Sequence, residues 1–295
     1  MSAREIYDTA TLGAAAEINA TYFRTKGGLL AARLEQTCYL AVPNDGETLI
    51  AYAIGLDIAP EHWTPGDFYG RGGFVAGEDG FRSYVEERTS HRRQLSRLAR
   101  PSIMSGAHTP WGWAQQTQLY SEGIVSHSTA EHGGFHLAPH RNAMVNPAWR
   151  NDDGWYEEDA QWAKVAMTFP ELFTAFERKC AHDTLRHGEP DAYELIVGVV
   201  LQPGESHVKD ERQFNRNHAA DWIVVAAINS SHRPGFVECV AKLGGERRSR
   251  EERRFLVPKA EYEIGRFGFV IDPARHARCD GPSDFIGWRD KASTN

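Results

Sequence analysis

The sequence has little of what zinc fingers and small secreted domains are built from. Its four cysteines lie far apart, and no CxxC or cysteine–histidine finger spacing is present. This pattern excludes a disulfide framework and favours reduced thiols in a cytoplasmic protein. No apolar run approaches the length of a membrane span, and the first residues lack the apolar segment of a signal peptide. We therefore expect a cytoplasmic protein that does not enter a membrane.

The chain also lacks the basic balance that is usual for proteins that coat nucleic acid. Of its 295 residues, 41% are hydrophobic and 25% are charged, which is normal for a globular protein with a core of its own. The formal net charge is −7, a mild excess of acid. This charge argues against obligate nucleic-acid binding and suits a basic partner surface.

Turn signals and hydrophobic patterning predict an α+β protein with two modules. Residues 1–100 are expected to form a smaller N-terminal α+β module, and residues 109–290 a motif-bearing α+β domain. Residues 101–108, which begin with a proline and contain a glycine, are the expected linker. No internal repeat or low-complexity tract suggests another division.

Four segments define the expected N-terminal module. Residues 10–24 have apolar side chains at helical spacing and predict a helix. Residues 36–42 and 48–56 flank an Asp-Gly turn and predict a β-hairpin. The aromatic, glycine-rich residues 57–82 are expected to be a loop that packs onto its own domain, although such a loop can also form a binding surface. Residues 84–100 predict a helix.

The larger module is expected to pass from helices into a C-terminal antiparallel sheet packed with helices. Two strands are predicted within residues 117–127, with a break at Glu122-Gly123, and a loop at His132-Gly133-Gly134. Helices are predicted over 157–168, 170–187 and 209–218. The sheet is expected to consist of residues 221–228, 235–243, 254–257 and 267–271.

The stretch from Thr109 to Trp162 is the richest in side chains that can do chemistry. It holds five of the eight tryptophans and four of the thirteen histidines, and so is the first place to seek a site. Histidines spaced by five and four residues can converge on a divalent metal with a carboxylate. The expected ligands are His127, His132, His136 and Asp159. Loop histidines also serve as hydrogen-bonded structural residues, so this alternative stays open.

A hydrolase built on this stretch would use the metal to activate water and a spare carboxylate to take the proton. The His127-Ser128-Thr129 segment also has the H-x-T form of two-histidine phosphoesterases, in which the hydroxyl holds a phosphate oxygen, but a clean second element is missing. The expected catalytic residues are His127, Thr129, His132, Glu157 and Glu158. The acids can instead offset the dipole of a helix that starts there.

The same stretch offers groups that would bind rather than react. Glycines let a ligand approach main-chain N–H groups closely, and exposed aromatic rings serve as contact surface. The expected binding residues are Gly133, Gly134, Trp111, Trp155 and Tyr156. Packing in a core is the alternative for the aromatic residues.

Two arginine-rich segments, within 88–100 and 247–254, supply the basis for a nucleic-acid-binding alternative. Both are interrupted or flanked by glutamates, and a solvated helix face and a solvated turn are the preferred explanations.

Several motifs between residues 109 and 288 resemble a family of uncharacterised proteins encoded on bacterial plasmids, integrated elements and phages. They are Thr109-Pro110-Trp111-Gly112, His127-Ser128-Thr129, His132-Gly133-Gly134-Phe135, Trp155-Tyr156-Glu157-Glu158-Asp159, Phe169-Pro170 and Arg254-Phe255-Leu256-Val257-Pro258. The resemblance implies the accessory genes of mobile genetic elements, many of which blunt restriction or CRISPR defence.

Three functions follow as hypotheses. The leading one is a mobile-element accessory protein for counter-defence, of the anti-CRISPR or anti-restriction type, that binds a host defence protein. The first alternative is a metal-dependent hydrolase or phosphoesterase that uses the His127 and His132 loop and the acids of 157–159. The second alternative is nucleic-acid binding. A cofactor is expected only for the hydrolase, as a divalent metal.

Overall fold

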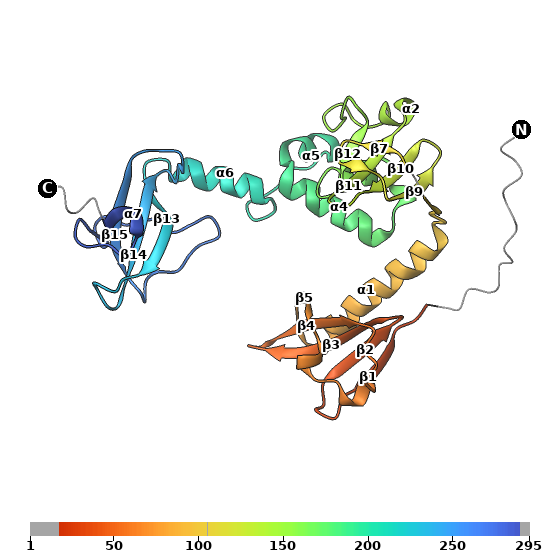
Figure 1. Ribbon diagram of the computed structural model, residues 1–295, viewed down its shortest axis with the longest axis horizontal. Helices are drawn as coiled ribbons and strands as arrows, with labels where there is room; N and C mark the ends of the chain where they lie inside the picture. Colours follow the sequence, from red (N-terminus) through yellow and green to blue (C-terminus); the bar gives the residue numbers. More distant parts are fainter. Residues whose placement is uncertain (1–17, 105, 290–295) are drawn as a thin grey trace, which may run out of the picture. The chain divides into compact units, whose positions relative to one another are not determined.

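The computed structural model describes residues 18–104 and 106–289, and it confirms the predicted α+β class. Its sheets are antiparallel (Figure 1). The chain divides into two compact units, residues 1–184 and 185–295. The expected modules 1–100 and 109–290 stay a prediction. In the described part of the chain, no helix has both the length and the apolar character needed to cross a membrane.

The N-terminal part of the first unit is a five-stranded meander whose strands follow one another in chain order. The strands are β1 (Thr21–Arg24), β2 (Leu30–Leu34), β3 (Thr37–Asn44), β4 (Glu47–Ile54) and β5 (Gly70–Val75). The predicted hairpin is confirmed as β3 and β4, which turn at Asp45 and Gly46 with φ of 44° and 86°. Such a left-handed pair is the turn that suits the twist of a hairpin.

The predicted helix over 10–24 is wrong where the structure describes it, because Thr21–Arg24 is strand β1; residues up to 17 lie outside the described residues. The strand pairs with β2 along its whole length. The apolar residues at helical spacing in this segment were too few to distinguish a helix from a strand.

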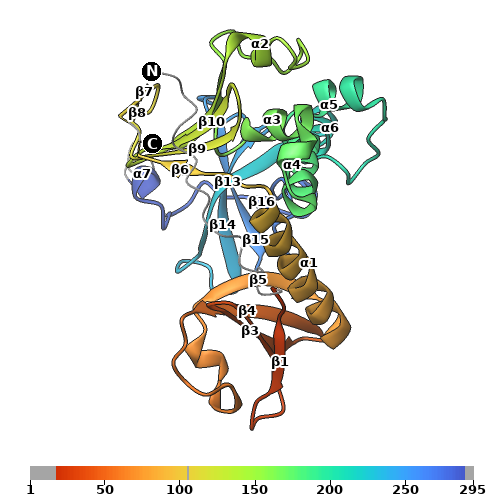
Figure 2. The ribbon, with the colours of Figure 1, turned by 90° about the vertical axis from the view of Figure 1, so that its right-hand side faces the viewer.

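Both faces of this sheet are covered. Helix α1 (Gly77–Arg97) lies along one face (Figure 2). It buries Phe81 and Val85 in the core on that face. The 57–69 loop contains the short helices η1 (Pro60–His62) and η2 (Pro65–Asp67) and packs Trp63 on the other face. Trp63 is only 2% exposed, which confirms that the loop packs onto its own domain. Residues 70–82 of the expected loop are instead β5 and the start of α1.

A second five-stranded sheet follows, in the order β12-β11-β10-β9-β6. Its strands are β6 (Ser102–Ile103), β9 (Gln116–Ser121), β10 (Ile124–Ser128), β11 (Gly133–Leu137) and β12 (Trp155–Glu157). A small hairpin, β7 (His108–Thr109) and β8 (Gly112–Trp113), precedes β9, and α2 (Pro139–Asn142) follows β11. The two strands predicted around Glu122-Gly123 are confirmed as β9 and β10.

Two predictions for this region are corrected. Gly133 and Gly134 begin strand β11 instead of forming a loop, because both pair with β10. The helix expected from residue 157 begins at Trp162 as α3 (Trp162–Thr168), since Glu157 still pairs with β11.

The helix expected from residue 170 also starts later. Residues Pro170–Leu172 form the short helix η3, and α4 (Ala175–Gly188) follows. The cap is Thr174, whose hydroxyl accepts a hydrogen bond from the Glu177 amide while Glu177 accepts one from the Thr174 amide. This reciprocal pair fixes the helix start. Arg100, after α1, makes a buried bidentate pair with the same Glu177, at 2.8 Å for both bonds.

The second unit contains helices and a four-stranded sheet. The helices are α5 (Pro190–Val197) and α6 (His207–Asn217), and a short α7 (Ile286–Arg289) lies near the end. The sheet runs in the order β13 (Trp222–Asn229), β14 (Phe236–Leu243), β15 (Glu252–Pro258) and β16 (Ala277–Arg278). Three predicted strands are confirmed. The fourth, over 267–271, is wrong: only an isolated bridge joins Val270 to Ile223.

A buried ion pair ties the last loop of this unit to its sheet. Arg254 on β15 donates to Glu238 on β14 at 2.8 Å, and both side chains are almost fully buried. Burial raises the pKa of Glu238, but hydrogen bonds from Ser283, Arg254 and the Asp284 amide outweigh burial and hold that pKa below its usual value. The carboxylate therefore stays charged in the core and holds the loop that follows β16.

We predict that Glu238→Ala lowers the free energy of unfolding by about 3–5 kcal/mol, because it removes the carboxylate that balances the buried Arg254 charge. Scanning calorimetry of the full chain measures this as a lowered transition. The control is Asp280→Ala, which removes the exposed partner of Arg278 and should cost under about 1 kcal/mol. Equal effects of the two changes would contradict the assignment.

Candidate functional site

The two faces of the second sheet carry different side chains. Residues opposite each other in antiparallel strands point to the same side, and sides alternate along a strand. The registers of β10, β11 and β12 therefore place Phe135 and Tyr156 on one face, where both are buried. The other face carries side chains that can bind or react: His127, His136, Trp155 and Glu157.

Gly134 lies in the middle of this second face and lets Trp111 lie directly against the sheet. A Cβ atom at Gly134 would be 2.3 Å from the Trp111 ring and 2.3 Å from the Tyr156 carbonyl oxygen. No larger residue fits without moving the backbone. Trp111 in turn meets Trp155 edge to face, with ring centroids 5.7 Å apart. This geometry is a favoured one for aromatic pairs.

The two histidines of this face pack on Trp155 and do not converge on a metal. The His136 ring lies 4.4 Å from the Trp155 ring, and the His127 ring lies 5.6 Å from it. His127 is buried, and its Nδ1 is 2.7 Å from the hydroxyl of Thr117. Burial, and then the neighbouring His136, lower the pKa of His127; burial also lowers the pKa of His136, against an opposing effect of Asp153. Both rings are therefore neutral near pH 7.

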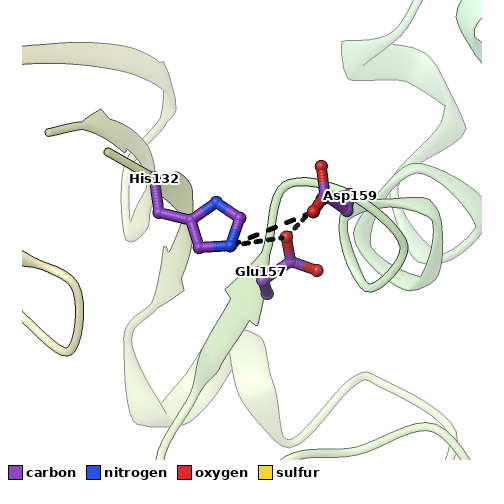
Figure 3. A group of neighbouring side chains, drawn as sticks. All are labelled: His132, Glu157 and Asp159. Atoms are coloured by element: carbon purple, nitrogen blue, oxygen red, sulfur yellow. Dashed lines mark hydrogen bonds and ion pairs between the residues drawn. The ribbon is translucent and has the colours of Figure 1, made fainter. Parts of the chain in front are cut away.

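His132 belongs to a separate group at the edge of the sheet (Figure 3). Its Nε2 lies 3.9 Å from a Glu157 oxygen and 3.9 Å from an Asp159 oxygen, and its Nδ1 lies 3.3 Å from Glu158. One ligand atom each of His132, Glu157 and Asp159 fall within 4.8 Å of one another, close enough to share a metal ion. One imidazole and two carboxylates suit a divalent cation.

Other bonds already engage parts of this group. The two Glu157 oxygens accept hydrogen bonds from the amides of Asp159, at 2.6 Å, and Ala160, at 3.2 Å. Glu157 thus closes the turn that leads to α3, a structural role like that expected for these acids. The Thr129 hydroxyl donates to the His132 carbonyl at 2.6 Å and accepts from the His132 amide at 3.1 Å. It shapes the turn between β10 and β11.

An open hollow of about 660 Å³ lies beside the second face. Trp111, Trp155 and Glu157 contribute to its wall, together with residues before β12. Asp152 and Asp153, both exposed, add two more carboxylates. The remaining lining residues are Pro110, Arg150, Asn151 and Gln161. We call this the Trp–Asp hollow.

The expected site residues thus do not form one group. Trp111, Trp155 and Glu157 line the Trp–Asp hollow. His132, Glu157, Glu158 and Asp159 form the cluster at the sheet edge, whereas His127, His136 and Thr129 are held elsewhere. Tyr156 faces the core, where its hydroxyl donates to Asn142 at 2.6 Å. Gly133 gives room to Glu158, whose carboxylate oxygen would lie 2.3 Å from a Cβ there.

Asp152 and Asp153 did not stand out from the sequence as site residues. The signal was present, because an acidic pair sits between Trp149 and Trp155. The pair indicates a site only together with the position of β12, which brings Trp155 and Trp111 to the same hollow.

Residues 104–219 match a family model described as a domain of unknown function (DUF7007). The match covers strands β9 to β12 of the second sheet, the Trp–Asp hollow and the His132 cluster, and it agrees with the expected uncharacterised domain family. Comparisons with curated proteins and with solved structures found no match.

The lowered histidine pKa values predict how stability depends on pH. A histidine whose folded pKa lies below the usual 6.5 binds more protons when unfolded, so the free energy of unfolding falls as pH drops through and below 6.5. Thermal unfolding between pH 8 and pH 5 should show this loss. A His127→Gln/His136→Gln protein should lose less over the same range, with His91, whose pKa is also lowered by burial, retaining its part. An unchanged pH profile in the double variant would refute the assignment.

Proposed function

We propose that this protein binds a basic surface of a partner protein through the Trp–Asp hollow. The observation that carries the proposal is the pairing of two tryptophans with three carboxylates around one open hollow. Tryptophan is enriched among the residues that dominate protein interfaces, and carboxylates complement basic partners. The mild acidity of the whole chain supports the same kind of partner.

Three of the residues that were expected to react are held in structural roles, which favours binding over catalysis. Glu157 accepts bonds from two amides, the Thr129 hydroxyl is engaged with its own turn, and His127 is buried against Thr117. These groups hold structure, whereas Asp152 is exposed, and within the described residues no hydrogen bond or ion pair engages its carboxylate. An exposed carboxylate beside aromatic rings is a recognition element.

We further propose that the partner is a defence protein of a bacterial host. The motif resemblance supports an accessory protein of a plasmid, phage or other mobile element that acts in the host cytoplasm, in counter-defence of the anti-CRISPR or anti-restriction type. Defence proteins that handle nucleic acid carry the basic surfaces that phosphate binding requires. Such a surface matches the charge of the Trp–Asp hollow.

A protection assay tests this function. Strains that each carry one restriction or CRISPR system are challenged with a targeted plasmid, and expression of the protein should restore plasmid establishment in at least one strain. Asp152→Lys/Asp153→Lys should abolish protection, because charge reversal repels a basic partner. Glu122→Lys/Glu171→Lys changes the net charge equally at exposed sites outside the hollow and should protect normally. Absence of protection in every strain would contradict counter-defence.

A second candidate function is metal-dependent hydrolysis, and the His132, Glu157 and Asp159 cluster is the observation that favours it. A divalent cation there would activate water for attack on a phosphodiester or similar substrate. Glu158, which reaches the other ring nitrogen of His132, would orient that ring.

Metal analysis separates the two functions. For the hydrolase, protein purified without a histidine tag should contain about one equivalent of zinc, manganese or iron per chain. His132→Ala should lose that metal together with any phosphodiesterase activity, and His140→Ala, a change of an exposed histidine outside the cluster, should keep both. Metal-free protein, with protection retained in His132→Ala, would exclude the hydrolase and leave binding.

A further inference from the structure

Trp111 and Trp155 define what can occupy the Trp–Asp hollow. Their rings stand 89° apart in an edge-to-face contact and both line the same hollow. An aromatic face attracts a cation through its quadrupole, and tryptophan does so most strongly. Both rings contribute to the wall of the hollow, so a cationic group that enters it meets tryptophan.

The carboxylates around these rings give the hollow its charge. Asp152, Asp153 and Glu157 line it, and Arg150 is the one basic residue among its lining residues. The Arg150 side chain donates hydrogen bonds to backbone carbonyls of the segment before it. Its Nε donates to the Val145 carbonyl at 3.0 Å, and its Nη2 donates to the Ala143 carbonyl at 2.8 Å. It braces the loop before β12, and the acids remain in excess at the hollow.

A backbone hydrogen bond holds the Asp153 carboxylate in place. Its Oδ1 accepts a hydrogen bond from the Trp155 amide at 3.0 Å. This bond fixes the Asp153 carboxylate relative to the backbone of Trp155. Asp152, its neighbour, is exposed and free to meet a ligand.

We infer that the Trp–Asp hollow takes an arginine side chain of the partner protein; this rests on the proposed binding function and names the group that it recognises. A guanidinium is planar, stacks on an indole ring, and donates two parallel N–H bonds to a carboxylate. A lysine ammonium is a point charge that cannot do both at once. Flat rings and fixed carboxylates side by side thus match arginine better than lysine.

Titration with defined peptides tests the inference. The probes are an arginine-rich peptide, the same peptide with lysine at each arginine, and the same peptide with citrulline, which keeps the shape without the charge. Calorimetry on the full chain should show binding of the arginine peptide, roughly tenfold weaker binding of the lysine peptide, and none of the citrulline peptide.

Variants of the hollow and their matched controls locate the binding. Asp152→Asn/Asp153→Asn, which keeps the acceptor for the Trp155 amide, and Trp111→Leu should each weaken the arginine peptide roughly tenfold. Glu122→Gln/Glu171→Gln removes two exposed acids elsewhere, and Trp113→Leu removes a tryptophan that is 68% exposed outside the hollow; both should bind normally. If Trp111→Leu fails to fold, the aspartate variant still decides.

Three results would overturn the inference: no binding of the arginine peptide, equal binding of the arginine and lysine peptides, or unchanged binding by the aspartate variant. The proposed function fails separately. If Asp152→Lys/Asp153→Lys abolishes plasmid protection while arginine peptides do not bind, the hollow binds a partner through other chemistry. If arginine peptides bind and protection is absent in every strain, the arginine site stands without the counter-defence role.

Discussion

The close approach of Trp111 to Gly134 is the contact on which the candidate site depends. Gly134, near the start of strand β11, leaves one position of the sheet without a side chain, and the Trp111 ring fills it. Trp111 then meets Trp155 on the neighbouring strand β12, and the two rings form part of the wall of the hollow. Any side chain at residue 134 would separate them.

The two faces of the second sheet have different roles because they carry different side chains. One face buries Phe135 and Tyr156 and gives the domain its rigidity, and the other presents Trp155 with its histidines. A binding surface built on paired strands keeps its geometry better than one on a loop. The acids at the end of β12 then serve two neighbours, the hollow and the His132 cluster, with Glu157 common to both.

Much of the fold was predictable because local signals were strong. The Asp45-Gly46 turn and the break at Glu122-Gly123 located two hairpins, since both sequences favour tight turns between apolar strands. The site was predictable only as a region. Which histidine meets which acid depends on the register of β10, β11 and β12, and residue spacing alone does not determine a register. His127 and His132, five residues apart, therefore ended in unrelated environments.

The most direct test of this account is the affinity of Gly134→Ala for an arginine-rich peptide, compared with that of Gly106→Ala. A Cβ at Gly106 meets nothing within 4 Å, so that protein should bind like the wild type. The added Cβ must displace both the Trp111 ring and the Tyr156 carbonyl. The account predicts that Gly134→Ala keeps its overall β-content by circular dichroism but loses roughly tenfold in affinity, because Trp111 no longer packs against Trp155. A folded Gly134→Ala protein with unchanged affinity would show that the tryptophan pair does not form the binding site.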